Sequence, residues 1–259
     1  MEPFYDYLKV WLSKEKLNVS ENTLKRLKQF ASIAEETRAK HPLKFDLEET
    51  DIQSWLNFLR GSQKYSDNSA YTHFKSLKRY LFWGMDNFFV SKTAFIKFHV
   101  PQVIPEAVFL YPRELKDYFN SYFSTPHHRN VQDLFCLMAD TGITYPELQE
   151  SMEFEYTHEI NSNKRVSLFG MAKEVFVKEE LPHMISSQKF NQYLKETLKL
   201  AGIIRSVSVD NKSLPVHEAA TIQAAKNTYT YAACVLHSEE VAMRVSRIKH
   251  YKTLKKFPL

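Results

Sequence analysis

The stretch that decides the fold is Leu137-Met-Ala-Asp-Thr-Gly-Ile-Thr-Tyr-Pro-Glu-Leu-Gln-Glu-Ser-Met152. Its apolar residues up to Met138 are typical of a buried helix. Gly142 predicts the end of that helix, because only glycine enters the left-handed backbone region cheaply. Pro146 predicts the first turn of a second helix, where its missing N–H leaves no hydrogen bond unmade. The stretch therefore predicts two helices joined by a tight glycine corner.

The composition is that of a globular protein. The chain has 259 residues, of which 44% are hydrophobic and 25% charged, enough for one large domain or two ordinary ones. There are only 5 glycines, which favours helices over glycine-rich phosphate loops. Cys136 and Cys234 lie in apolar stretches, so we expect free buried thiols and no metal site. No apolar run approaches the length that crosses a membrane, so we expect a cytoplasmic protein.

Residues 1–90 have the pattern of a helical domain. Apolar residues recur with helical spacing over 4–13, 20–39, 48–61 and 66–83, and Ser20 and Ser66 are suitable N-caps. Basic residues occupy the polar faces of the second and fourth of these helices: Lys25, Arg26, Lys28, Lys75, Lys78 and Arg79. Taken singly, each is equally explained as an ordinary solvated surface charge.

The rest of the chain predicts a linker and a second domain. Prolines interrupt short apolar groups over residues 91–112, which predicts the linker. The second domain, 113–259, is expected to be helical with three short antiparallel strands where apolar and polar residues alternate. The expected strands are 154–158, 165–170 and 175–177, and a polar loop is expected to lead to Pro215.

Two short motifs carry a resemblance to a known family. Thr141, Gly142, Ile143, Glu147 and Leu148 match the first catalytic box of the tyrosine recombinases (phage-integrase family), Thr-Gly-apolar-Arg-x-Ser/Gly-Glu-Leu. The resemblance implies a mainly α chain with a small antiparallel sheet. In it a helical core-binding (SAM-like) domain precedes an integrase-like α+β domain of the catalytic type.

The second motif lies near the C-terminus. His217 matches the histidine of the family's second box, His-x-x-Arg, and Tyr251 lies 34 residues beyond it, close to the family's spacing to its nucleophilic tyrosine. Lys173 falls where the family has its catalytic lysine, and Lys164 is a second candidate. The resemblance therefore makes Tyr251, His217 and Lys173 the candidate catalytic residues.

Both boxes depart from the family pattern at the arginine. Thr144 stands in the first arginine position and Ala220 in the second, while Arg129 and Arg205 are the nearest arginines elsewhere. The family's arginines neutralise the phosphate through paired N–H groups, a geometry that Thr and Ala lack. Losing one preorganised donor typically costs about 10²–10³ in rate. The resemblance thus implies a retained scaffold with lost chemistry, in which the candidate catalytic residues are vestigial.

These observations predict a DNA-binding protein with a catalytically inactive integrase-like fold, acting as a phage or mobile-element regulator: a repressor or an accessory factor. The expected partner is double-stranded DNA in the nucleoid, which the protein contacts through the DNA phosphates. We expect the protein to bind as a homo-oligomer and to need no cofactor or metal. Residues 242–259 carry six basic residues and no acidic one, and Arg244 and Arg247 among them join the expected contacts. The tail from Ile248 is expected to dock on a neighbouring subunit, to touch DNA or to be disordered.

Two alternatives stay open. The first is an active site-specific recombinase that uses Tyr251 and arginines from other positions. The second is a protein-interaction module without nucleic-acid binding, in which the basic helix faces are merely solvated.

Overall fold

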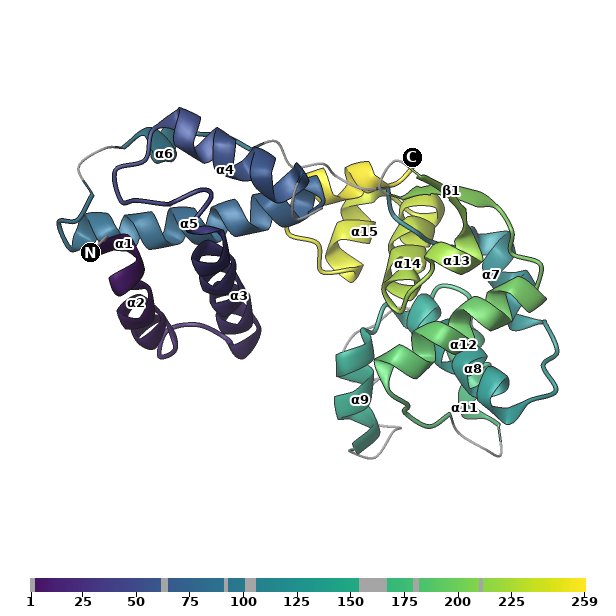
Figure 1. Cartoon of the computed structure of the whole chain (residues 1–259). Coiled ribbons are helices and arrows are strands. Elements are labelled where there is room, and N and C mark those ends of the chain that lie inside the picture. Colours follow the sequence, from purple (N-terminus) through teal and green to yellow (C-terminus); the bar gives the residue numbers. More distant parts are fainter. Residues whose placement is uncertain are drawn as a thin grey trace. The chain divides into compact units, whose positions relative to one another are not determined.

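The computed structural model describes residues 3–61, 65–90, 93–100, 106–153, 167–178, 182–209 and 212–259. The chain divides into two compact units, Met1–Val103 and Ile104–Leu259, each of which is described by itself. Most described residues are helical, and a two-stranded antiparallel sheet lies in the second unit (Figure 1). The expected fold class, mainly α with a small antiparallel sheet, is confirmed.

The first unit is built from helices. In chain order they are α1 (Pro3–Asp6), α2 (Leu8–Glu15), α3 (Glu21–Thr37), α4 (Glu49–Gly61), α5 (Asp67–Asp86) and α6 (Ala94–Lys97). The helices expected from the sequence are confirmed, except that the first is broken at Tyr7 into α1 and α2. Ser20 and Ser66 act as N-caps, because each side chain accepts a hydrogen bond from the backbone N–H three residues further on.

Aromatic side chains fill the core of this unit. Trp11, Trp55 and Tyr80 are buried, and the ring centroids of Trp11 and Tyr80 lie 4.8 Å apart. The Tyr80 hydroxyl donates a hydrogen bond to the carbonyl of Phe4 at 2.5 Å, so the polar end of this buried ring has a partner. These contacts fix the N-terminal helices against α5.

The segment expected to be a linker is packed near both of its ends. Phe95 of α6 and Val100 belong to the core of the first unit, and the ring of Phe95 contacts Phe82 with centroids 5.1 Å apart. Further on, Phe109 and Leu110 are buried in the second unit. Residues 101–105 between them lie outside the described part.

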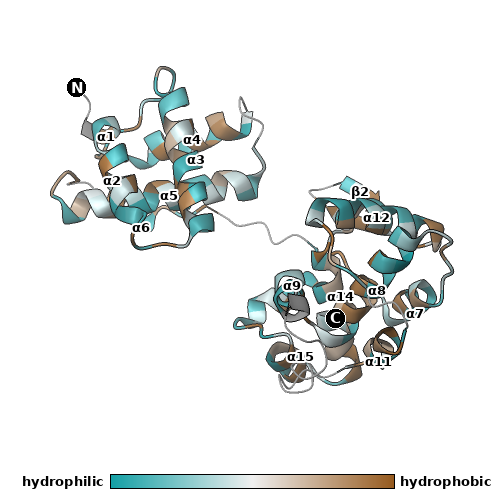
Figure 2. Ribbon diagram, turned by 90° about the horizontal axis from the view of Figure 1, so that it is seen from below, coloured by the Kyte–Doolittle hydropathy of each residue, from teal (hydrophilic) through white to brown (hydrophobic). Residues whose placement is uncertain are grey.

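The second unit surrounds one central helix. Its elements are α7 (Pro112–Phe119), α8 (Pro126–Thr141), α9 (Tyr145–Glu153), α11 (Met171–Phe176), α12 (Ser187–Leu200), β1 (Ser206–Val209), β2 (Lys212–Pro215), α13 (Val216–Ala219), α14 (Gln223–Leu236), α15 (Glu239–Val245) and the 3-10 helix η1 (Tyr251–Lys256). Helix α8 packs against α7, α11, α12 and α14. Figure 2 shows α8 and α14, with their apolar residues in brown, in the middle of the unit.

The glycine corner is confirmed. Gly142 ends α8 with a φ of 69°, and Pro146 lies in the first turn of α9. A Cβ atom on Gly142 would lie 2.5 Å from the ring of Tyr229 in α14, so the corner also lets α14 approach closely. The backbone of Gly142 is therefore part of the contact between α8, α9 and α14.

The expected strands are not where the sheet is. The first of them, 154–158, and residues 165–166 of the second lie outside the described residues. Residues 168–170 form a bend and 171–176 form α11, so the described part of the second expected strand and the third, 175–177, are both wrong. The cause is a long-range contact, because the buried carboxylate of Asp140 accepts hydrogen bonds from the backbone N–H groups of Phe169 and Ala172 and starts a helix there.

The observed sheet lies where a polar loop was expected. Strands β1 and β2 pair antiparallel, with Ser206 opposite Pro215 and Val209 opposite Lys212. Only Val207 of β1 is buried, which explains why the alternation of this hairpin is weak in the sequence. The hairpin delivers the chain directly into α13, which holds His217.

Candidate functional site

In the first box, the residue at the family's arginine position stabilises the start of a helix. Thr144 precedes α9, and both its backbone N–H and its hydroxyl donate to one carboxylate oxygen of Glu147, at 2.8 and 2.7 Å. Its carbonyl accepts the first helical hydrogen bond from Leu148 at 2.8 Å, so Thr144 is the N-cap of α9. The side chain in the arginine position therefore fixes the start of a helix.

In the second box, the residue at the family's arginine position is part of the hydrophobic core. His217 is buried in α13, and its Nδ1 lies 3.3 Å from the carbonyl oxygen of Ile203. Ala220 ends α13 and is 0% exposed within the main core of the unit, together with Ala224 and Ala225. A longer side chain at this position would displace its neighbours, so the methyl group of Ala220 is fitted to the core.

One cavity lies beside both boxes. Its volume is about 620 Å³, and its lining comes from the start of α9, the segment before α12 and the start of α14: Tyr145, Pro146, Gln149, Met184, Ile185, Ser186, Ser187 and Ile222. None of these described lining residues is charged. The described lining of this cavity is therefore mainly apolar and carries no cation.

Tyr251 contacts an acidic side chain. It is the first residue of η1 and 55% exposed, and its hydroxyl donates a hydrogen bond to the carboxylate of Glu239. That hydrogen bond raises the pKa of the phenol above its ordinary value, which disfavours the phenolate. In the described part of the chain, no hydrogen bond or ion pair joins Tyr251, His217 and Lys173.

Lys173 lies in a helix and not in a turn between strands. It is the third residue of α11, and its side chain is exposed. The residues around Lys173 that were expected to be strands form a bend at 168–170 and α11 at 171–176. Lys164, the second candidate, lies outside the described part.

Two arginines outside the boxes stabilise the fold. Arg205 forms a double contact with Glu114, at 3.0 and 3.2 Å, and its guanidinium lies 4.3 Å from the centre of the Tyr111 ring. Arg129 donates two hydrogen bonds to the carbonyls of Phe123 and Ser124. Both arginines that were nearest to the boxes in the sequence are thus engaged within the second unit.

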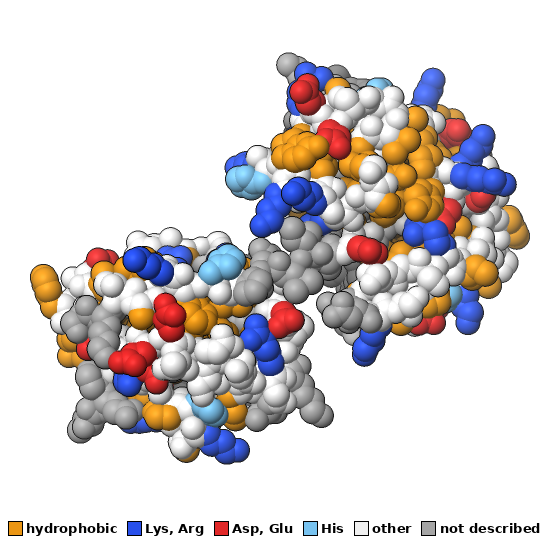
Figure 3. Space-filling view, turned by 90° about the horizontal axis from the view of Figure 1, so that it is seen from above, with side chains coloured by type: hydrophobic (Ala, Val, Ile, Leu, Met, Phe, Trp, Pro, Cys, Tyr) orange, Lys and Arg blue, Asp and Glu red, His pale blue; other side chains and the backbone are white. Residues whose placement is uncertain are grey.

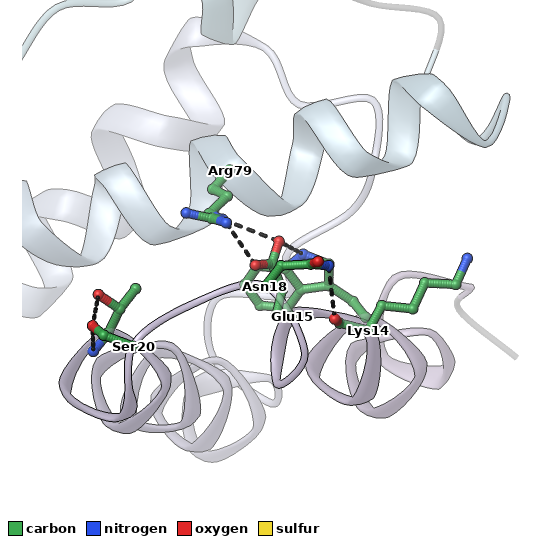
Figure 4. A network of polar contacts seen from close by, with 7 residues as sticks. Lys14, Glu15, Asn18, Ser20 and Arg79 are labelled. Carbon is green, nitrogen blue, oxygen red and sulfur yellow. Dashed lines mark hydrogen bonds and ion pairs between the residues drawn. The ribbon is translucent and has the colours of Figure 1, made fainter.

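The predicted DNA contacts of the first unit differ in whether other residues of the unit already engage their charged groups. Arg79 of α5 forms a double contact with Glu15, at 3.0 and 2.6 Å, and Figure 4 shows it pointing from α5 toward the end of α2. Lys78 donates to the carbonyl of Ile96 at 2.7 Å. The charged groups of Arg79 and Lys78 are therefore already bound within the first unit.

The other four predicted contacts of the first unit are exposed. Lys25 pairs with Glu21 one turn earlier at 3.0 Å, and the ammonium of Lys75 lies 5.6 Å from the centre of the Tyr71 ring. Arg26 and Lys28 have no described partner and lie with Lys25 on α3. Of the predicted contacts in this unit, the basic face of α3 is thus the most available to a polyanion.

The C-terminal segment packs on its own unit. Leu254 and Phe257 are buried against Ala107 and Phe109, and the backbone N–H of Ala107 donates to the carbonyl of Lys256 at 3.0 Å. Of the three expectations for this tail, disorder is therefore wrong for the described chain. The anchored segment carries exposed basic side chains at 244, 247, 249, 252 and 255.

The basic side chains form no continuous stripe on the face drawn in Figure 3. There Lys and Arg, in blue, are scattered singly or in small groups among white and orange atoms. Among the described residues, no group of three or more His, Cys, Asp or Glu side chains is arranged to hold a metal ion. None of the described helices combines the length and apolar character needed to cross a membrane.

Comparison with solved structures identifies the fold. The chain is similar to lambda integrase (75-356), solved as a dimer bound to a COC' core site, with a TM-score of 0.67 and 13% identity over 99% of this chain and 94% of that chain. The chain thus has the fold of the tyrosine recombinases. XerA recombinase aligns over 98% of this chain and 92% of its own with 14% identity, but its TM-score is only 0.39. Neither the protein-family models nor the curated proteins contain a match to the chain.

Proposed function

We propose that this chain binds duplex DNA without cleaving it and acts as a phage or mobile-element regulator, as a repressor or an accessory factor. The proposal rests mainly on the two positions where the family has its arginines. Thr144 at the first position is a helix N-cap, and Ala220 at the second is buried in the core. The mainly apolar cavity beside the boxes and the contact between Tyr251 and Glu239 agree with lost chemistry.

DNA binding is supported by the fold and by the exposed cations. The similar integrase was solved on a DNA core site, and both units of this chain present basic side chains on anchored elements. The exposed residues Lys25, Arg26 and Lys28 on α3 are the proposed phosphate contacts of the first unit. Affinity that comes from phosphate contacts falls steeply with salt, because binding releases the counterions of the DNA.

Neutralising the basic face of α3 should weaken duplex binding. We expect the triple variant Lys25→Gln, Arg26→Gln, Lys28→Gln to lower affinity for random-sequence duplex. The negative slope of log K against log salt should become shallower by about three, which is about one for each lost phosphate contact. Fluorescence anisotropy at 50 to 200 mM salt measures both quantities.

A matched control is available on α12. Lys189, Lys195 and Lys199 are also exposed, so changing all three to Gln removes the same net charge from a helix outside the proposed interface. Equal losses in the two triple variants would mean that only the total charge matters. Absence of duplex binding by the natural chain at low salt would favour the protein-interaction alternative.

A further inference from the structure

Two residues other than glycine have a positive φ among the described residues. They are Phe88, at 63°, and Arg247, at 55°. Each follows a helix, and in each case the next N–H donates back across the helix end: Phe89 to Gly84 at 2.9 Å, and Ile248 to Met243 at 2.8 Å. Glycine is the usual residue at such a position, since a side chain there is strained.

The Arg247 side chain contacts the first turn of α9. Its Nη1 lies 3.0 Å from Oε1 of Glu147, whose other oxygen holds Thr144. The side chain of Arg247 is nevertheless 61% exposed. An exposed ion pair contributes little to stability, so the pair does not account for a strained residue at this position.

The surroundings of Arg247 favour an anionic ligand. Residues 242–259 contain no acidic residue, and exposed Arg244 and Lys249 flank Arg247 in the sequence. The segment is anchored by buried Leu254 and Phe257, so its cations are presented from a fixed backbone. The guanidinium has five N–H donors in a planar fork, and a described partner engages only one of its nitrogens.

We propose that Arg247 binds a backbone phosphate of duplex DNA, and that its strained conformation serves this contact at the expense of stability. Backbone strain that the fold does not need is typical of functional positions. The inference rests on the proposed function and deepens it, because it identifies a phosphate contact on the second unit beside the corner between α8 and α9.

The variant Arg247→Gly separates function from stability. Glycine removes the guanidinium and also relieves the strain, so we expect a melting temperature about 2–4 °C higher together with weaker duplex binding. The slope of log K against log salt should fall by about one, as for a single lost phosphate contact. Effects of opposite sign on stability and affinity are not expected from a residue that only supports the fold.

The variant Phe88→Gly is the matched control. Phe88 has the same strain at a helix end and is 96% exposed, but it carries no charge. We expect this variant to raise the melting temperature and to leave duplex affinity unchanged. If Arg247→Gly binds duplex as tightly as the natural chain and with the same salt slope, the proposal for Arg247 is overturned. If the natural chain itself binds no duplex, the proposed function fails instead.

Discussion

Replacing Gly142 by Ala should destabilise the second unit by about 3 kcal/mol. The left-handed conformation of residue 142 costs a side chain about 1 kcal/mol. The new Cβ atom would also lie 2.5 Å from Cδ1 and Cε1 of Tyr229, a buried residue in the core of the unit, and such overpacking typically costs about 1–3 kcal/mol. Urea unfolding followed by far-UV circular dichroism measures the loss.

Alanine variants at two other glycines measure the cost of the left-handed backbone conformation without a steric clash. Gly170 and Gly202 have a φ of 78° and 74°, but a Cβ atom on either would meet nothing within 4 Å. Their alanine variants should each lose only about 1 kcal/mol. All three tryptophans lie at positions 11, 55 and 83, so Trp fluorescence reports the first unit and serves as an internal reference. Equal losses for the three alanine variants would contradict the close approach of Tyr229.

Replacing Asp140 by Ala should cost about 3–5 kcal/mol and release α11 from α8. The carboxylate of Asp140 is 0% exposed and accepts hydrogen bonds from the Ser167 hydroxyl, the Phe169 N–H and the Ala172 N–H, at 2.6, 2.6 and 2.8 Å. Its loss removes three hydrogen bonds to a charged acceptor, each typically worth about 1.5–3 kcal/mol, and leaves the buried N–H of Ala172 without its partner.

Hydrogen exchange of peptides from α11 should rise more in the Asp140→Ala variant than exchange of peptides from α12. Ser167→Ala is the control, since it removes only one of the three hydrogen bonds and should cost about 1 kcal/mol. Normal protection of α11 in the Asp140→Ala variant would show that the carboxylate does not hold this helix.

Features fixed by neighbouring residues were predictable from the sequence. Ser20 and Ser66 cap helices because a hydroxyl reaches an N–H three residues away. Gly142 and Pro146 mark a corner because their backbone preferences are intrinsic. The mainly helical fold follows from such local preferences combined with apolar periodicity.

Features fixed by distant residues were not predictable in the same way. The helix at 171–176 depends on Asp140, about thirty residues away in the chain, and no local pattern reveals that contact. The short hairpin formed by β1 and β2 buries only Val207, so its alternation gives almost no signal. The engagement of Arg79 by Glu15 likewise depends on how α2 and α5 pack.

The use of the two arginine positions was not predictable from the sequence. Thr144 and Ala220 were recognisable as departures from the family pattern. Their roles as helix cap and core residue follow only from the contacts of Glu147 and from the burial of α13. Arg247 was predicted only as one basic residue among several, because neither its positive φ nor its contact with Glu147 has a signature in the sequence.

We propose that the chain binds duplex DNA and does not cleave it. The most direct test uses nicked suicide duplexes, selected for binding from a random-sequence pool and labelled at the strand that a tyrosine would capture. Each binding reaction is divided between a native gel and a denaturing gel. We expect a shifted complex on the native gel and no covalent adduct on the denaturing gel. A denaturant-resistant adduct that disappears in the Tyr251→Phe variant would contradict the claim and establish an active recombinase.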